Sequence, residues 1–410
     1  MSRIITTPPE KYKGSKRLKI IFYCQYVWGM GHLFRSIELV RALAGHDVVL
    51  VAGGREVDVE LPDHVTLVRL PGLYIDEQFT TLIPEDAGKT VDDIQRERKK
   101  ILFSLFEQHP PDVFVIELYP FGRALFGFEL QPLLDGIRQG RFGEMKVVCS
   151  LRDILVEKKD PQAYEERVLN LLNTYFDLLL IHSDDQLLAL DETFSRMDDI
   201  RIPTVYSGFV SPKANPAAGR RLRRELGIAS QEKLIVVSAG GGRSGYALLS
   251  RILDAYHLMA NSGQIRIEMF SGPFRDPEEF KKLTAKSVDG IRIRYFKNRF
   301  LDYLSAADLS VSLAGYNTCM NLLAARVPAL IFPYSKQQEQ PIRVEKIKNF
   351  IPMKILRGKD IEPALLSSYI QKMLLESRPL GTVSINLDGA ENSATYLKNW
   401  INKPIEYQGN

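Results

Sequence analysis

Cysteine is scarce in this chain, and its three cysteines, Cys24, Cys149 and Cys319, lie far apart. This spacing argues against a disulfide-rich scaffold and against a zinc site, because both need paired or clustered cysteines. The composition instead fits a reducing compartment. We therefore expect a cytoplasmic protein, with peripheral attachment to the inner face of the membrane as an open alternative.

Long apolar runs and a strong net charge are also missing. No apolar run reaches the roughly 18 residues that a membrane-spanning helix needs. The formal net charge is only +4, which is too small to indicate a nucleic-acid-binding protein. Residues 1–17 contain basic side chains without the apolar stretch that is typical of a signal peptide, so we interpret them as an N-terminal tail.

Hydrophobic residues, by contrast, are plentiful. They make up 45% of the 410 residues, which is enough for a large core, and the length favours two or three domains of about 150 residues each. Short apolar segments alternate with amphipathic segments along most of the chain. Such alternation predicts parallel sheets with helices on both faces, so the expected fold class is α/β with two doubly wound, Rossmann-like halves.

The composition changes between Pro203 and Gly219, where prolines and glycines accumulate. We interpret this segment as a linker. The predicted organisation is a tail at 1–17, an N-terminal domain at 18–202, the linker at 203–219, a C-terminal domain at 220–389, and a C-terminal helix and tail at 390–410. A cleft between the two domains is the default place for a ligand.

One stretch of the C-terminal domain has the pattern of an anion site. A strand at 309–313 is followed by the small-residue turn 314–318 and by a helix that starts on this turn. Free N–H groups and the helix dipole then point the same way, which suits a negatively charged group. A second strand at 329–332 leads to a polar loop with Glu339 and Gln340, at the same carboxyl edge of the sheet. An ordinary βαβ unit without a ligand would have the same pattern.

A glycine-rich loop at 240–245 lies between another strand and helix. Its successive glycines let a backbone approach a phosphate closely, Ser238 and Ser244 can donate hydroxyls, and Arg243 adds positive charge. The loop matches neither the Walker motif nor the Rossmann fingerprint, and a tight turn without function is the alternative. Two anion-suited helix starts in one domain favour a diphosphate ligand.

In the first half, the loop after the first strand contains Gly29, Gly31 and His32. A histidine at this edge can take a proton from an acceptor hydroxyl. Glu117 ends a parallel strand at the same edge, where it could accept a hydrogen bond from His32 and fix the imidazole tautomer. The alternatives are a histidine without a chemical role and a solvated or helix-capping carboxylate.

Other residues near this edge are harder to interpret. Arg123 and the pair Arg152–Asp153 follow strand ends, where an arginine can contact a ligand. An Arg–Asp pair is as often a structural ion pair as a ligand contact. Val27 and Trp28 could meet a lipid or an aglycone, or could simply pack beneath a loop. The sequence leaves these alternatives open.

Four segments together show a resemblance to a known family. They are YCQYVWGMGHLFRSIELVRAL, VIELYPFGRALFGFEL, SLRDIL and SAGGGRSG, followed by the stretch at 312–340. On these motifs the chain resembles inverting glycosyltransferases of the GT-B fold, in which two Rossmann-like domains face each other across a cleft. The most similar class is family 28, which includes the peptidoglycan N-acetylglucosaminyltransferase, and within it a bacterial branch described only as predicted glycosyltransferases. The match covers about residues 18–400.

The resemblance implies a site for a nucleoside diphosphate sugar, with UDP as the expected nucleotide, on the C-terminal domain. The donor-binding residues that it implies are Gly241, Gly242, Arg243, Ser244, Phe296, Gly315, Asn317, Thr318, Asn321, Glu339 and Gln340. Residues 315–318 would face the diphosphate, Glu339 and Gln340 the sugar hydroxyls, and Phe296 the base. Asn321 departs from the family, which has a glutamate there for the ribose; an amide binds a diol without charge assistance.

For the acceptor, the resemblance implies that His32 is the base and that Glu117 orients it. The acceptor-side residues that it implies are Trp28, Gly29, Gly31, Arg123 and Arg152. The expected reaction is a metal-independent, inverting hexosyl transfer without a cofactor, and the acceptor is left open among a lipid, a glycan and a small molecule. Two other classes share the fold and stay open: a non-hydrolysing UDP-sugar 2-epimerase, and a nucleotide-sugar-binding protein without catalysis.

Overall fold

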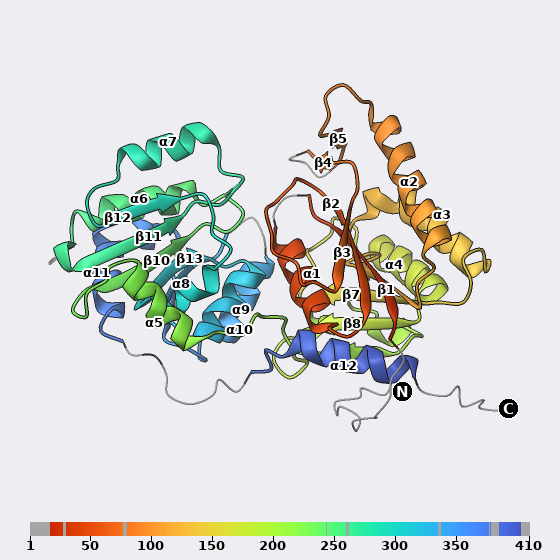
Figure 1. The fold of residues 1–410 in the computed structure, drawn as a ribbon. Coiled ribbons are helices and arrows are strands. Elements are labelled where there is room, and N and C mark those ends of the chain that lie inside the picture. Colours follow the sequence, from red (N-terminus) through yellow and green to blue (C-terminus); the bar gives the residue numbers. More distant parts are fainter. Residues whose placement is uncertain are drawn as a thin grey trace. The chain divides into compact units, whose positions relative to one another are not determined.

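The computed structural model describes residues 17–27, 30–76, 80–242, 244–259, 262–334, 338–376, 378 and 385–402. These residues form two compact units (Figure 1). The first contains residues 32–210 together with the first strand and the C-terminal helix, and the second contains residues 211–387. Each unit is built on its own parallel sheet, so the predicted α/β class is confirmed.

In the first unit, seven of the described strands form one sheet in which all neighbours are parallel. Their spatial order is β3 (Val65–Arg69), β2 (Asp47–Gly53), β1 (Lys19–Gln25), β6 (Val113–Glu117), β7 (Lys146–Arg152), β8 (Leu178–His182) and β9 (Thr204–Tyr206). The helices are α1 (Gly31–Ala42), α2 (Val91–Gln108), α3 (Gly127–Arg138), α4 (Pro161–Tyr175) and α12 (Gly389–Ile401). A short hairpin pairs β4 (Leu73–Ile75) with β5 (Leu82–Pro84).

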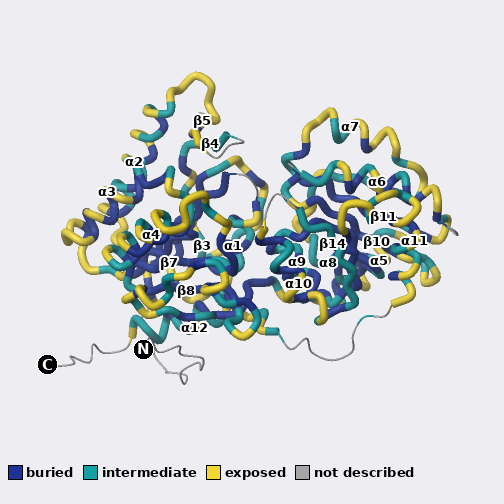
Figure 2. The backbone as a smooth tube through the Cα atoms, turned by 180° about the vertical axis from the view of Figure 1, so that it is seen from behind, coloured by how far each residue is buried: buried dark blue, intermediate teal, exposed yellow. Residues whose placement is uncertain are grey.

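The second unit repeats this plan with six described strands. Their order is β12 (Ile291–Arg294), β11 (Ile265–Phe270), β10 (Lys233–Ser238), β13 (Leu309–Leu313), β14 (Ala329–Phe332) and β15 (Met353–Ile355). The helices are α5 (Pro216–Glu225), α6 (Tyr246–Tyr256), α7 (Pro277–Ala285), α8 (Phe300–Ala306), α9 (Tyr316–Ala325), α10 (Glu339–Ile347) and α11 (Pro363–Met373). The central strands are buried, whereas the outer turns of helices such as α7 are exposed (Figure 2).

Both sheets reverse their strand order next to their first strand. The reversal lies between β1 and β6 in the first unit and between β10 and β13 in the second. Loops that leave neighbouring strands at such a point diverge to opposite faces and leave room for a ligand at the carboxyl edge. The loops that carry the predicted site residues therefore lie where this fold class binds ligands.

The expected linker at 203–219 differs from the structure. Part of it is β9, which pairs with β8 in the first sheet, and its end forms the first turns of α5. Pro216 stands at the start of α5 behind the capping side chain of Asn215, where a missing N–H costs nothing. Pro203 therefore directly precedes a strand, and Pro216 begins a helix. The chain passes from one unit to the other between Val210 and Ser211.

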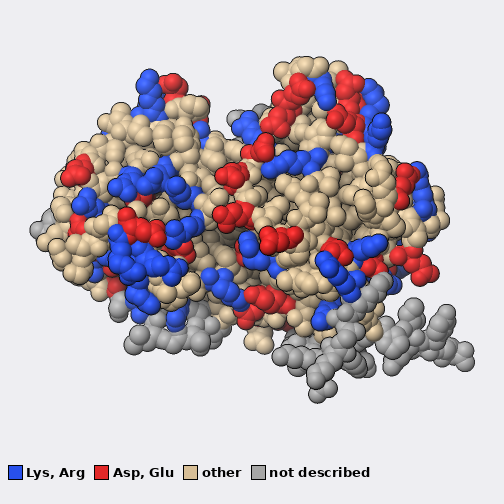
Figure 3. Space-filling model, viewed as in Figure 1, with Lys and Arg blue, Asp and Glu red and all other residues tan. Residues whose placement is uncertain are grey.

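The short basic helix expected near residue 220 is present as α5. Its apolar side packs closely on α8, because a Cβ on Gly219 would lie 2.7 Å from the backbone of Ser305. Arg220, Arg221 and Arg224 are exposed, whereas Arg223 bonds to Asp308 at 3.0 Å. Basic side chains gather over α5 in the surface view (Figure 3). No helix in the described part of the chain is both long and apolar enough to cross a membrane.

Candidate active site

The structure brings His32 and Glu117 together. His32 lies in the first turn of α1, just after β1, and Glu117 is the last residue of the neighbouring strand β6. Leu118 follows with φ of 68°, a strained value for a residue with a side chain, so the chain turns sharply as the strand ends. The imidazole Nδ1 lies 2.7 Å from the carboxylate Oε1, which is within hydrogen-bonding distance.

Arg35 completes this cluster from the next turn of α1. Its guanidinium donates to Oε1 of Glu117, the same oxygen that faces His32. The side chain of Glu117 is fully buried and that of Arg35 is 2% exposed, whereas that of His32 is 18% exposed. The other carboxylate oxygen, Oε2, is buried without a hydrogen-bond partner among the described residues. Arg35 was not predicted from the sequence.

The charges in this cluster decide where the imidazole proton lies. Burial alone would raise the pKa of Glu117, but His32 and Arg35 hold that pKa below its ordinary value, so the carboxylate is charged. Burial, aided by Arg123 and Arg35 and opposed by Glu117, lowers the pKa of His32 to about 3. A neutral imidazole beside a carboxylate must donate from Nδ1. Its Nε2 is then the atom that can accept a proton.

A second buried group fixes the end of β1. The guanidinium of Arg98 donates to both carboxylate oxygens of Glu129, at 2.8 and 2.6 Å, and to the side-chain oxygen of Gln25 at 2.7 Å. Tyr23 adds a hydroxyl bond of 2.5 Å to Glu129. This network holds the last residues of β1, from which the loop to His32 departs. A sequence signal was available, because Arg98 lies on the buried stripe of α2 with Ile94, Leu102 and Phe106.

Cationic side chains gather near the base cluster. The Lys158 amino group lies 5.2 Å and the Arg167 guanidinium carbon 5.6 Å from the ring centre of Tyr164. Burial lowers the pKa of Lys158, and the positive charges of Arg167, Arg152 and Arg123 lower it further. Each of the three arginines therefore acts on Lys158 as a like charge, and a bound anion would be favoured beside the Lys158 amino group.

The predicted acceptor-side residues are only partly described. Arg123 adopts a left-handed conformation with φ of 60° and donates from Nε to the carbonyl of Gln25 at 2.7 Å. Arg152 is the last residue of β7. Gly31 is the first residue of α1, and Trp28 and Gly29 lie outside the described residues.

In the second unit, the glycine loop follows β10 as predicted. Gly240 has φ of 61°, and a Cβ there would meet no atom within 4 Å, so this part of the loop is open. Gly242, with φ of 95°, packs instead against Gly272 after β11. A Cβ on Gly272 would lie 2.4 Å from the Gly242 nitrogen, so no other residue fits there without moving the loop. Arg243 lies outside the described residues.

Arg275 also supports this loop, and neither it nor Gly272 was predicted. Its side chain is fully buried, one Nη donates to the carbonyl of Ser244 at 2.6 Å, and the other to Glu279 at 2.7 Å. Arg275 therefore fixes the chain just before α6 begins. The only available signal was the Ser-Gly-Pro sequence after β11, which indicates a turn but not what the turn contacts.

The second predicted anion site lies at the start of α9. Gly315 is the N-terminal cap residue and makes no side-chain cap bond, and the first turn contains Asn317 and Thr318 but no acidic residue. This N-terminus can therefore receive an external anion. The side-chain oxygen of Asn321, one turn further, is buried without a hydrogen-bond partner among the described residues.

The prediction of a polar loop at Glu339 and Gln340 is wrong, because these residues begin a helix. Both residues are in the first turn of α10, and each is only 7% exposed. The Gln340 side-chain oxygen accepts a bond of 2.9 Å from the backbone N–H of Tyr334. The helix was missed because its first residues are polar and buried together with Arg343. Phe296 follows β12 and is half-buried.

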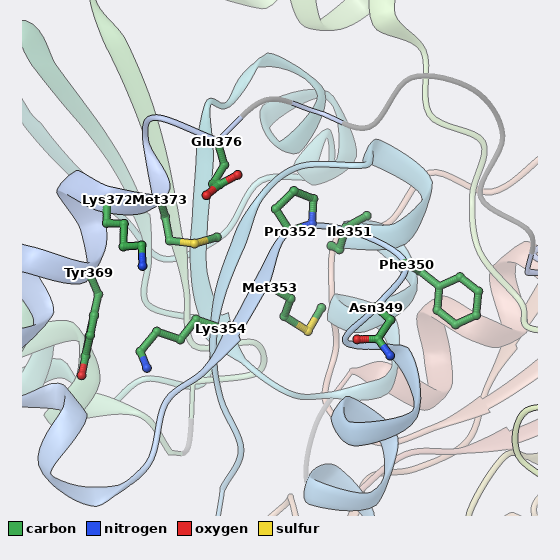
Figure 4. Close-up of a pocket in the computed structure, with 10 residues that line it drawn as sticks. All are labelled: Asn349, Phe350, Ile351, Pro352, Met353, Lys354, Tyr369, Lys372, Met373 and Glu376. Carbon is green, nitrogen blue, oxygen red and sulfur yellow. The ribbon is translucent and has the colours of Figure 1, made fainter.

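A cavity of about 610 Å³ lies away from all these residues. It is formed by the segment that enters β15 and by α11, and Met353, Lys354 and Tyr369 are among its lining residues (Figure 4). Lys354 lies over the Tyr369 ring at 4.0 Å. Because the segment before β15 enters the sheet at its amino edge, this cavity is opposite to the edge with the glycine loops.

Comparison with known proteins identifies a family that this chain resembles. Residues 235–395 match the glycosyltransferase family 28 C-terminal domain. The UDP-N-acetylglucosamine–N-acetylmuramyl-(pentapeptide) pyrophosphoryl-undecaprenol N-acetylglucosamine transferases of Shouchella clausii and Carboxydothermus hydrogenoformans are 23% and 28% identical. These matches cover 50% and 29% of this chain, and 61% and 32% of the respective relative. The chain thus spans about a third to three-fifths of these curated relatives.

Solved structures support the fold. A UDP-glucosyltransferase from Polygonum tinctorium matches with a TM-score of 0.57 and 12% identity, over 95% of this chain and 94% of that one. Such a low identity supports the fold only. The chain therefore has the two-domain architecture of the GT-B glycosyltransferases. Its likeness to family 28, predicted from the motifs, is confirmed by the match of residues 235–395 to the family's C-terminal domain.

Proposed function

We propose that this protein transfers a sugar from a nucleoside diphosphate donor, with UDP as the first candidate, to an acceptor hydroxyl. The observation that carries the proposal is His32, bonded to the buried Glu117 at 2.7 Å, at the carboxyl edge beside the strand reversal. A charged, buried carboxylate behind an imidazole with a free Nε2 is the arrangement of a general base. The matched C-terminal domain supports a nucleotide-sugar donor.

In the proposed reaction, Nε2 of His32 takes the proton of the acceptor hydroxyl as its oxygen attacks the anomeric carbon. The bond from this carbon to the diphosphate breaks, and attack from the opposite side inverts the configuration. The helix N-termini at Gly245 and Gly315 stabilise the negative charge that develops on the leaving diphosphate. The proposal includes no metal ion, so activity should survive a chelator.

A donor screen tests the proposal directly. The purified protein is mixed with UDP-, TDP- and GDP-sugars, and thermal shift identifies those that bind, since a ligand at 100 times its Kd adds about 2.7 kcal/mol of stability. Donors that bind are then incubated with and without a mixture of lipid, glycan and small-molecule acceptors. Conversion of the donor to its 2-epimer without an acceptor would indicate the epimerase class, and binding without turnover a non-catalytic protein.

The sugar contact gives a prediction for Glu339. We expect Glu339→Ala to weaken binding of the nucleotide sugar much more than binding of the free nucleotide, because only the former has sugar hydroxyls. Calorimetry with both ligands measures the difference. Glu345→Ala, on the exposed side of the same helix, is the matched control. Equal losses for the two ligands would remove Glu339 from the sugar site.

The acceptor class follows from the cations around Tyr164. The names of the curated relatives include a pyrophosphoryl-undecaprenol acceptor. In this chain the positive charges of Arg167, Arg152 and Arg123 all act on Lys158. We therefore extend the proposal to an acceptor that carries a phosphate or pyrophosphate group near the hydroxyl to be glycosylated.

This extension predicts a loss of affinity in Lys158→Met. With the donor site saturated by UDP, the variant should bind farnesyl pyrophosphate at least about ten-fold more weakly, the equivalent of 1.4 kcal/mol, and farnesol without change. Calorimetry measures both. Lys159→Met is the control, because Lys159 is the exposed neighbour in the sequence and is not among the charges that shift the pKa of Lys158. An equal effect of the two lysines would argue against an anionic acceptor at this place.

A further inference from the structure

The base cluster contains one more cation than a histidine–carboxylate pair requires. Arg35 and His32 both approach Oε1 of Glu117, and the guanidinium Nη2 lies 3.1 Å from the imidazole Nδ1. A charged carboxylate can only accept hydrogen bonds, so the Nδ1 and the Nη2 that face its Oε1 must both be donors. The 3.1 Å approach is therefore a contact between two donors that share one acceptor. A protonated imidazole would therefore lie directly against a permanent positive charge.

The burial of Glu117 explains why a countercharge is needed. A fully buried carboxylate is strongly unfavourable unless a cation compensates it. Two side chains can supply this charge: Arg35, which is always protonated, or His32, by taking up a proton. If His32 supplied it, the pair would be an imidazolium–carboxylate ion pair at neutral pH, and His32 could not accept a proton from a substrate.

We infer that Arg35 is a positioning residue that supplies the countercharge of Glu117 and so offsets the attraction of this carboxylate for a proton on His32. Burial then keeps His32 neutral and available as a base. The catalytic meaning of this assignment rests on the proposed function, but the charge assignment does not. Arg35 acts through Glu117 and His32, and it has no assigned contact with a substrate. Its test must therefore measure the protonation of His32 as well as the rate.

Other groups around the pair do not provide this charge. On β1 and β7, burial raises the pKa of Cys24 to about 12 and raises that of Cys149 strongly, so both thiols are neutral. On β8, burial lowers the pKa of His182 to about 3, and this ring bonds to Ser150 at 2.7 Å and to Ser207 at 3.0 Å.

Arg123, on the segment after β6, is the remaining cation that acts on the pair. It lowers the pKa of both His32 and Glu117. Its Nε, however, donates to the carbonyl of Gln25, and it makes no ion pair with Glu117 within the described residues. Arg35 is therefore the cation bonded directly to the carboxylate.

The test is a titration of the full chain, labelled with nitrogen-15 histidine, followed by long-range proton–nitrogen NMR. The spectrum of His32→Ala assigns the His32 signals. In the natural protein we expect a neutral Nδ1–H imidazole at neutral pH. In Arg35→Met we expect an imidazolium at the same pH, with the pKa of His32 above its ordinary value of about 6.5. A neutral His32 in Arg35→Met would overturn the proposal.

Two further variants separate charge from folding. Arg35→Lys keeps the positive charge and should leave His32 neutral; an imidazolium there would also contradict the proposal. The double variant Arg35→Met/Glu117→Gln removes both charges, so His32 should return to the neutral form even if the single variant is less stable. If Arg35→Met does not fold, these two spectra decide the question, because a persistent imidazolium in the double variant rules out the assignment.

The pH–rate profile links this charge to the proposed reaction. In Arg35→Met the acid limb of kcat/KM should move to higher pH by at least one unit, which is about ten-fold in rate on the limb, and turnover should recover at alkaline pH. A merely structural role for Arg35 would lower the rate at every pH. An imidazolium with undiminished turnover at neutral pH would keep the charge assignment and remove His32 as the base.

Discussion

Replacing His32 with alanine should reduce turnover by about 10²–10⁴-fold, the usual contribution of a general base. Donor affinity should remain near normal, because the predicted donor residues all belong to the other unit. The variant should also fold, since Arg35 still bonds to Glu117 when the imidazole is absent. Single-turnover kinetics and calorimetry with the donor measure the two effects separately.

The control for this variant is His109→Ala. His109 is exposed at the end of α2 in the same unit, so its loss should change neither rate nor affinity. Full transferase activity in His32→Ala would remove the proposed mechanism and leave the fold untouched. Equal losses of donor affinity and turnover would instead indicate that His32 contributes to binding.

Because the cluster is buried, a substitution of Glu117 should change the stability of the protein as well as its rate. A Glu117→Gln variant removes the acceptor that neutralises Arg35, whose side chain is 2% exposed. Breaking one side of a buried ion pair typically costs about 3–5 kcal/mol. A rate loss in Glu117→Gln would therefore mix lost orientation of His32 with lost stability. The double variant with Arg35→Met is the cleaner test, because it removes both charges.

The pH range of activity should extend below that of an ordinary histidine base. The pKa of His32 is lowered in the folded protein, so the imidazole stays neutral as the pH falls through about 6.5 and protonates only near pH 3. The unfolded chain takes up this proton earlier, so the His32 contribution to stability is lost as pH falls below about 6.5. The acid limb of the rate profile should lie well below the limb of Arg35→Met.

Much of this site could be predicted because it depends on strand ends. Alternating apolar and amphipathic segments fixed the parallel sheets, and in parallel sheets the residues that follow the strands share one edge. His32 follows β1, and Glu117 ends β6 in the same sheet, whereas Gly315 follows β13 in the other sheet. The carboxyl edge on which each of them lies could therefore be predicted from the sequence. The hydrogen bond between His32 and Glu117 was an assumption that only side-chain geometry could settle.

The missed residues share a different property. Arg35, Arg98 and Arg275 are long cations inside the structure, and each is held by carboxylates or carbonyls from another element. A sequence shows a charge on a helix but not the distant group that compensates it. Gly272 was missed for a similar reason, because its need for glycine comes from the close approach of the Gly242 loop. Long-range contacts of this kind have no local pattern.

Gly315→Asp should change binding and stability in opposite directions. Gly315 has φ of −63° and ψ of 153°, which any residue can adopt, and a Cβ there would have only the Thr318 hydroxyl nearby, at 3.9 Å. Aspartate is also a favourable N-cap, and it would fill a cap position that now makes no side-chain bond. We therefore expect α9 to gain about 0.3–1 kcal/mol.

The same carboxylate should nearly abolish binding of UDP if its diphosphate lies at this turn. Two like charges about 4 Å apart cost roughly 4 kcal/mol at an effective dielectric of 20, which corresponds to about a 10³-fold loss of affinity. Gly315→Asn is the matched control, because asparagine caps a helix equally well without the charge, and it should retain most of the binding. Calorimetry with UDP and thermal unfolding measure both effects. A stabilised Gly315→Asp variant that binds UDP normally would place the diphosphate away from α9. Its stabilisation would show that the carboxylate caps the helix, and normal binding would show that no phosphate lies beside it.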